Sequence, residues 1–312
     1  MGQLSGHKVK FLYRMQLKRS TTSVSDIARL MKIRLISAEL LLAVASLILA
    51  GGLSVKWIEL LELIVLGYMG LGGSAAINSY LDRDVDAIMS RTIDRPIPAG
   101  RISPRVALVF GLSLLALSVV LSAFLLNILT ALIIGVGSAL YILFYTVYLK
   151  RRTPNAVLWG GLSGAIPALG GWSVYAQTDW AVPLLIFLVV FLWQPSHFWS
   201  LSIYYRDDFR NAHIPALSTI SENRTIARRS LLFNMSVIAA TYLLYFVGHL
   251  SVAFLAIMTV MNVLLLAASV AATQNRPKEF YWRNFRFSLA YMIVFLLSMI
   301  VSGVLSPTMV AL

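Results

Sequence analysis

The sequence predicts an all-α, polytopic membrane protein in which nine transmembrane helices form one bundle. Of its 312 residues, 59% are hydrophobic and only 12% are charged, and the mean hydropathy is +0.79. Soluble domains are about 45–50% apolar and about 25% charged. A soluble core of this length cannot bury so much apolar surface, so the composition excludes a soluble enzyme. Cysteine is absent, which excludes disulfides, thiolate metal sites and cysteine nucleophiles.

Long stretches without charge mark the predicted spans, because about 20 apolar residues cross the hydrocarbon core of a bilayer. The nine predicted spans are 35–53, 57–77, 106–126, 128–148, 156–176, 182–201, 231–247, 252–272 and 287–304. Asn127 interrupts a tract that is too long for a single crossing, so we predict two helices joined by a tight turn there.

The distribution of basic residues predicts the orientation of these helices. Lys and Arg fall in five segments, 1–34, 83–105, 150–152, 206–229 and 276–286, and only Lys56 lies outside them. With nine spans, all five segments lie on one side, which the positive-inside rule assigns to the cytoplasm. We therefore expect a multi-pass protein of the cell membrane with a cytoplasmic N-terminus and the C-terminus on the opposite side.

This arrangement also predicts the domain organisation and the kind of partner. Residues 1–34 form a basic cytoplasmic segment, and residues 35–312 form a single transmembrane domain. The net charge of +13 then faces anionic membrane lipid or an anionic substrate, and nucleic acid is not an expected partner.

A first acidic cluster follows the second predicted span. Asn78, Asp82 and Asp86 are spaced by four residues, and a step of four advances only about 40° around a helix, so they share one face while Asp84 points nearly opposite. Like charges at this spacing destabilise a helix unless a cation lies between them. Mg²⁺ prefers hard oxygen ligands and bridges one or two carboxylates to substrate phosphates. The spacing favours a magnesium site over a solvated helix end whose acids pair with nearby arginines.

The loop after this cluster carries Arg91, Arg95 and Arg101, with two prolines and a glycine among them. Guanidinium groups match phosphate oxygens in bidentate geometry, and the prolines and glycine favour a shaped turn over a continuing helix. The positive-inside rule alone explains the arginines but not the acids beside them. Carboxylates, a metal and arginines together predict a diphosphate site at the cytoplasmic face.

A second acidic cluster, Asp207 and Asp208, follows the sixth predicted span on the same side. The two acidic loops are therefore expected to converge on one Mg²⁺-diphosphate from opposite directions. Further cations enter the first span and follow the fourth, namely Lys32, Arg34, Lys150 and Arg151.

These residues carry a resemblance to a known family. Asn78-x-x-x-Asp82-x-x-x-Asp86, followed by Arg91-Thr-x-x-Arg95-Pro-x-Pro, resembles the first aspartate motif of the UbiA-type intramembrane prenyltransferases. Four further stretches resemble the haem O synthases (protohaem IX farnesyltransferases) within that superfamily: Lys150-Arg-Arg-Thr153-Pro154-Asn155, Gly160-Gly-Leu-Ser-Gly164-Ala-Ile-Pro167, Trp193-Gln-Pro195-Ser-His197-Phe198-Trp199 and Asp208-Phe-Arg-Asn-Ala-His-Ile214-Pro215. The second acidic motif is shorter than in many superfamily members, since Asn211 and Ala212 stand where a second aspartate is expected.

The resemblance implies a reaction and roles for its residues. It implies Mg²⁺-dependent transfer of the farnesyl group of farnesyl diphosphate to a vinyl group of haem B, with water completing the addition, to give haem O. Asp82, Asp86 and Asp208 are the expected metal ligands, and Asn78 joins them as a catalytic residue. The residues expected to bind the substrates are Lys32, Arg34, Arg91, Arg95, Arg101, Lys150, Arg151, His197, Trp199 and Asp207.

Some assignments remain open at the level of sequence. His197 is interpreted either as a haem contact or as a buried histidine bonded to a neighbouring helix. Tyr141, Tyr145 and Tyr148 recur at helical spacing, and we interpret them as a packing stripe in preference to a set of rings that face a carbocation. The alternative acceptors are a quinone precursor or a lipid. A transporter is the alternative of a different class, although the acidic clusters here lie at helix ends rather than at the bilayer midplane, and the acids within spans, such as Glu39 and Glu62, lie close to the span ends.

Overall fold

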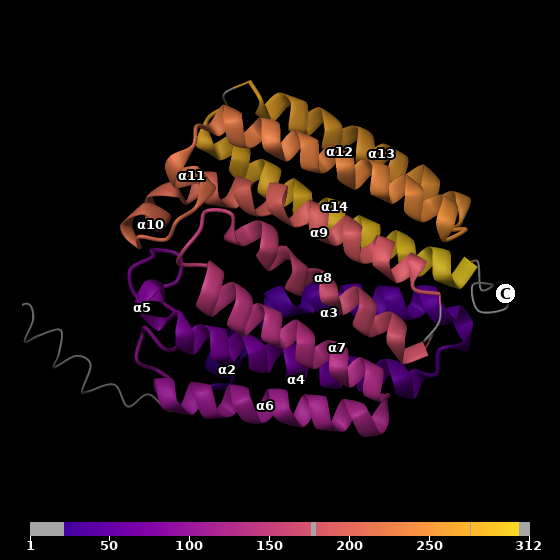
Figure 1. Ribbon diagram of the computed structural model, residues 1–312, viewed down its shortest axis with the longest axis horizontal. Helices are drawn as coiled ribbons and strands as arrows, with labels where there is room; N and C mark the ends of the chain where they lie inside the picture. The colour runs from indigo at the N-terminus through magenta and orange to yellow at the C-terminus, as the bar shows by residue number, and fades with distance from the viewer. Residues whose placement is uncertain (1–21, 176–178, 275, 306–312) are drawn as a thin grey trace, which may run out of the picture.

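The computed structural model describes residues 22–175, 179–274 and 276–305. Within these ranges the chain forms helices and no strands, as predicted, and the long helices lie side by side in one bundle (Figure 1). Most of the predicted basic segment 1–34 and the C-terminal residues 306–312 lie outside the described residues.

Short connections join most of the long helices, whereas longer segments that contain short helices join two pairs of them. The long helices are α3 (Ile33–Gly51), α4 (Trp57–Leu81), α6 (Pro104–Leu125), α7 (Ile128–Ala139) continued by the π-helical η2 (Leu140–Leu149), α8 (Ala156–Tyr175), α9 (Ala181–Tyr204), α12 (Asn223–Val247), α13 (Val252–Ala272) and α14 (Lys278–Leu305). The short ones are α2 (Val24–Leu30), η1 (Gly52–Ser54), α5 (Arg83–Asp86), α10 (Arg206–Asn211) and α11 (Leu217–Ile220). The two longer segments join α4 to α6 and α9 to α12.

Eight helices in the described part of the chain are long and apolar enough to cross a membrane. The predicted span 156–176 corresponds to α8, which contains Pro167 and is not among the eight. Instead α8 packs closely inside the bundle: a Cβ atom placed on Gly171 would lie 1.8 Å from the carbonyl oxygen of Ala43 in α3. A membrane-spanning role for α8, and with it the count of nine spans, remains a prediction.

One predicted turn lies where it was expected, whereas two helices begin earlier than predicted. The turn at Asn127 is confirmed, since its side chain caps α7 by accepting a hydrogen bond of 2.8 Å from the backbone N–H of Thr130. In contrast, α12 begins at Asn223 and α14 at Lys278, well before the predicted 231 and 287. Both helices continue past the apolar region because the long stems of arginine and lysine side chains extend from the membrane interface toward water.

The short helices α5, α10 and α11 gather at one end of the bundle (Figure 1). Val85 and Met89, from α5 and the loop after it, pack against Phe209 and Ile214, from α10 and the loop after it, in one buried cluster. Packing of these apolar side chains holds the two acidic loops against each other. The candidate site lies at this end.

Candidate functional site

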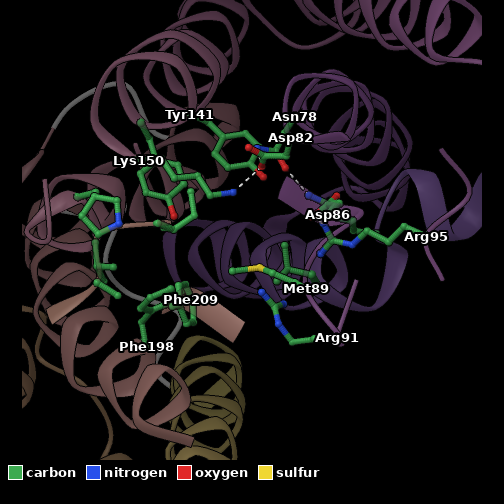
Figure 2. A pocket seen from close by; sticks show the side chains of 18 residues that line it. Asn78, Asp82, Asp86, Met89, Arg91, Arg95, Tyr141, Lys150, Phe198 and Phe209 are labelled. Carbon is green, nitrogen blue, oxygen red and sulfur yellow. Dashed lines mark hydrogen bonds and ion pairs between the residues drawn. The ribbon is translucent and has the colours of Figure 1, made fainter. Parts of the chain in front are cut away.

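A cavity of about 150 Å³ lies between the two acidic loops and the adjacent helix ends. Its polar wall comes from α4, α5, the loop after α5 and the end of η2, and its apolar wall from the start of α8, from α9 and from the loop after α10. Phe198 and Phe209 lie across the cavity from Asn78 and Asp82 (Figure 2). The lining residues are Lys32, Leu35, Asn78, Asp82, Asp86, Met89, Arg91, Arg95, Tyr141, Tyr145, Lys150, Ala156, Val157, Phe198, Phe209, Ile214, Pro215 and Ala216.

The first acidic cluster forms the buried wall of this cavity. Asn78, Asp82 and Asp86 are all buried. Although α4 ends at Leu81, the backbone N–H of Asp86 donates to the carbonyl of Asp82 at 2.8 Å, so the helical spacing is kept into α5. Asp84 does not line the cavity, and its side chain is 60% exposed. The prediction that Asp82 and Asp86 share one face, and that Asp84 points away from it, is therefore confirmed.

Cations from three separate segments pair with this wall. Lys150 at the end of η2 donates to Asp82 Oδ2 at 2.5 Å, and Arg95 Nη1 donates to both oxygens of Asp86 at 2.8 and 2.7 Å. Lys32, which precedes α3, donates to Asn78 Oδ1. Burial, reinforced by the Arg95 guanidinium, lowers the pKa of Lys32 to about 7. The acids and cations are thus held in alternation, as a site for a charged metal–phosphate complex requires.

One oxygen of this wall has no hydrogen-bond partner. Asp82 Oδ2 accepts from Lys150 and, at 2.9 Å, from Asn78 Nδ2, whereas the buried Oδ1 accepts from no group in the described chain. An unpaired buried carboxylate oxygen is costly, because it has lost water without gaining a donor. This oxygen, the Asp86 carboxylate and the Asn78 amide are the hard oxygen donors that Mg²⁺ prefers, so the residues present fit that ion.

The π-helical winding of η2 shapes the wall next to these acids. The hydroxyl of Thr146 donates to the carbonyl of Tyr141 at 2.8 Å, and the N–H of Lys150 donates to the carbonyl of Tyr145 at 2.8 Å, both across five residues. Such wide turns occur often at functional sites. Tyr141 and Tyr145 line the cavity, so the predicted packing stripe is wrong for these two residues, while Tyr148 is 54% exposed. Hydrophobic periodicity alone does not distinguish this winding from a regular α-helix.

The second acidic cluster meets the first loop but stays outside the cavity lining. Asp208 Oδ2 accepts a hydrogen bond from Ser90 Oγ at 2.8 Å and one from the backbone N–H of Arg91 at 3.3 Å, which ties α10 to the loop after α5. Asp207 has a side chain that is 84% exposed and lies 3.4 Å from Arg210. Among residues 22–175, 179–274 and 276–305, no three His, Asp or Glu side chains are grouped closely enough to hold a metal.

The predicted arginines have separate places. Arg91 and Arg95 line the cavity, Arg91 near its mouth with its guanidinium 5.8 Å from the ring centre of Tyr205. Arg101 instead donates to Asp26 at 2.7 Å and so fastens α2 to the loop. Arg151 pairs with Asp84 on the outer side, at 2.7 Å to each carboxylate oxygen. Arg34 is exposed on α3 and does not line the cavity.

The two predicted residues of α9 do not line the cavity. His197 is stacked between Trp193 and Phe285, with ring centres 4.3 and 4.4 Å away, and its Nδ1 lies 2.6 Å from the hydroxyl of Ser288 in α14. The structure therefore agrees with the interpretation of His197 as a buried histidine bonded to a neighbouring helix. Trp199 is buried among apolar side chains and packs edge-on against Phe233. Their neighbour Phe198 is the α9 residue that faces the cavity, and sequence reasoning passed over it because an apolar residue carries no chemical signal.

Comparisons with known proteins agree on a family. The family model described as "UbiA prenyltransferase family" matches residues 40–308. A protoheme IX farnesyltransferase from Symbiobacterium thermophilum is 38% identical over 265 residues, which is 81% of this chain and 88% of the relative.

Solved structures of low sequence identity share the fold. A digeranylgeranylglyceryl phosphate synthase superposes with a TM-score of 0.74 at 17% identity, over 90% of this chain and 98% of that one. A UbiA homolog from Archaeoglobus fulgidus bound to GPP and Mg²⁺ superposes with a TM-score of 0.64 at 14% identity, over 88% and 99%.

Proposed function

The chain belongs to the UbiA prenyltransferase family, and from that premise we propose that it transfers the farnesyl group of farnesyl diphosphate to a vinyl group of haem B, giving haem O. The observation that carries the proposal is the unpaired, buried Asp82 oxygen in a wall of alternating acids and cations, opposite an apolar wall. The choice of substrates is supported by the relatives at 37–40% identity that are named protoheme IX farnesyltransferase.

The polar wall binds the diphosphate of the prenyl donor. Lys32, Arg91, Arg95 and Lys150 are cationic residues that line the cavity. Lys150 and Arg95 exchange part of their contact with Asp82 and Asp86 for phosphate oxygens when the substrate enters. Their charges then stabilise the negative charge that builds up on the departing diphosphate, which is electrostatic catalysis by groups that need no reorganisation.

Asp82 and Asp86, with the Asn78 amide, would hold a magnesium ion at the diphosphate, where it would supply Lewis-acid assistance to departure of the leaving group. Asp208 supports this arrangement from the second loop, either as a further ligand or through the Ser90 and Arg91 contacts that fix the first loop.

The apolar wall holds the prenyl chain and keeps water away from the allylic cation. Phe198 and Phe209 face the acids across the cavity (Figure 2), Ile214 lines the same cavity, and the rings of Tyr141 and Tyr145 lie stacked with centres 6.2 Å apart. The faces of tyrosine rings attract positive charge, so these rings stabilise the cation as the C–O bond breaks.

Direct assay of the product tests the proposal. The purified protein is incubated with haem B, farnesyl diphosphate and Mg²⁺, and the farnesylhydroxyethyl haem is sought by mass spectrometry, with a chelator as the control. We expect the product to form and to disappear with the metal. Diphosphate release that requires a quinone precursor or a lipid in place of haem would show that the acceptor is wrong. A folded sample that releases no diphosphate with any acceptor would overturn the assignment as a transferase.

A further inference from the structure

The structure holds a carboxylate inside a membrane span that the machinery described above does not use. Glu39 lies on α3, within the apolar helix Ile33–Ser54, and makes no hydrogen bond or ion pair with the described residues. Ionisable side chains within transmembrane segments are costly, face the bundle interior and mark functional positions. Glu39 therefore needs an explanation beyond packing.

The face of α3 on which Glu39 lies is the face that forms the cavity. At 100° per residue, position 39 lies about 40° from position 35 around the helix, and Leu35 lines the cavity, as does Lys32 just before the helix. Further along the same face, the hydroxyl of Ser46 donates to the carbonyl of Ala168 in α8 at 2.6 Å. Glu39 is partly buried and lies on this face, beyond the residues that line the cavity and before the contact with α8.

Glu39 lies farther along α3, toward the membrane interior, than Lys32, which is expected to bind the diphosphate. Seven residues at 1.5 Å each put it roughly 10 Å along the α3 axis from Lys32, toward the membrane interior. Its electrostatic neighbours are Lys32 and Tyr141, which both line the cavity. The reacting carbon of farnesyl diphosphate is bonded to the diphosphate, and a helical side chain leans toward the helix N-terminus. The Glu39 carboxylate is therefore directed back toward a diphosphate held at Lys32 and Asp82.

We propose that Glu39 is the catalytic base that takes the proton from the water completing the transfer; this assignment rests on the proposed function. The C–O bond of farnesyl diphosphate breaks and diphosphate leaves with the electron pair. The terminal vinyl carbon of haem bonds to the farnesyl carbon, which leaves a cation on the adjacent carbon. Water oxygen bonds to that carbon, and the O–H proton passes to the Glu39 carboxylate, so that a hydroxyl remains on the product.

Substitution of Glu39 by its amide tests the assignment, because Glu39→Gln keeps the shape and removes the base. Loss of a general base typically costs about 10²–10⁴-fold in rate, so we expect haem O formation to fall at least about 100-fold with an unchanged KM for farnesyl diphosphate. Glu39→Asp should restore part of the rate. Glu62→Gln is the matched control: Glu62 lies in α4, sixteen residues or roughly 24 Å before Asn78, and its removal should leave turnover unchanged.

Product analysis in water labelled with oxygen-18 separates a base from a structural residue. In the wild-type protein, the haem product should carry the label and should equal the diphosphate released. In Glu39→Gln, we expect diphosphate release to exceed labelled product. Wild-type rates in Glu39→Gln, or a loss explained wholly by a higher KM for farnesyl diphosphate, would overturn the role of Glu39 alone. A wild-type protein that forms no farnesylated haem would overturn the proposed function, and the role of Glu39 with it.

Discussion

The two acidic loops lie at the same end of the bundle and carry similar residues, yet they differ in burial and in partners. In the first loop Asp82 and Asp86 are buried and bonded to cations from other segments of the chain. In the second loop Asp207 is exposed and pairs only with Arg210, three residues away. Asp208 lies between these extremes, bonded to a hydroxyl and a backbone N–H of the first loop.

The difference follows from spacing. Residues four apart project from the same side of a helix, so Asp82 and Asp86 both face the cavity, whereas adjacent residues such as Asp207 and Asp208 diverge by about 100°. The first loop can therefore present two carboxylates to one ion, and the second can present at most one. From this comparison we expect substitutions in the first loop to lower turnover, and substitutions in the second loop to act mainly by displacing the first loop.

The largest effect is expected at the buried carboxylates. Asp82→Asn or Asp86→Asn removes a charge that faces the metal–diphosphate complex, and turnover should fall about 10³-fold, as for loss of a group that stabilises transition-state charge. Asp84→Asn, on the opposite side, should change turnover less than about threefold. Steady-state assays of the three variants measure this, and equal losses at Asp84 and Asp82 would break the comparison.

A smaller effect is expected at the cation that bridges from η2. Lys150→Met removes a charged hydrogen bond, which contributes about 1.5–3 kcal/mol, so the KM for farnesyl diphosphate should rise about 10- to 100-fold. Its neighbour Arg151 pairs with the outer Asp84, and Arg151→Met is the matched control, with a KM within about threefold of wild type. A larger effect at Arg151 would mean that the substrate binds on the outer side of α5.

A still smaller effect is expected where the two loops meet. If Asp208 acts by fixing the first loop, Asp208→Asn and Ser90→Ala each weaken the same contact, and each should raise the KM about fivefold, the value of one ordinary hydrogen bond. The double variant should be no worse than the more severe single variant. If Asp208→Asn lowered turnover as much as Asp82→Asn does, and Ser90→Ala left turnover unchanged, Asp208 would instead be identified as a metal ligand.

The smallest effect is expected at Asp207. Exposed ion pairs contribute about 0–1 kcal/mol, and this one joins neighbours within α10. Asp207→Asn should leave both kcat and the KM within about twofold of wild type in the same assay. A tenfold loss would show that the second loop contacts substrate through its exposed side.

The sequence was most informative about the fold where the signal is local. Charge-free stretches located the long helices, and Asn127 located the turn between α6 and α7, because the cost of polar groups in lipid and the capping of a helix end are fixed by a few neighbouring residues. The same signal located α8, but the close approach of its Gly171 to Ala43 of α3 depends on a partner distant in the chain and could not be predicted from local sequence.

In the candidate site, too, local features were predictable from the sequence and contacts between distant helices were not. The sequence by itself determined that Asn78, Asp82 and Asp86 share a face and that Asp84 does not, since a helical period is a local property. The tertiary structure alone decided which cations reach them: Lys150 and Arg95 pair with the buried acids, while Arg34, Arg101 and Arg151 do not line the cavity. It also decided that Phe198, Tyr141 and Tyr145 form the opposite and adjacent walls. These contacts join helices far apart in the chain, and the orientation of each helix follows from packing of the whole bundle, to which every side chain contributes.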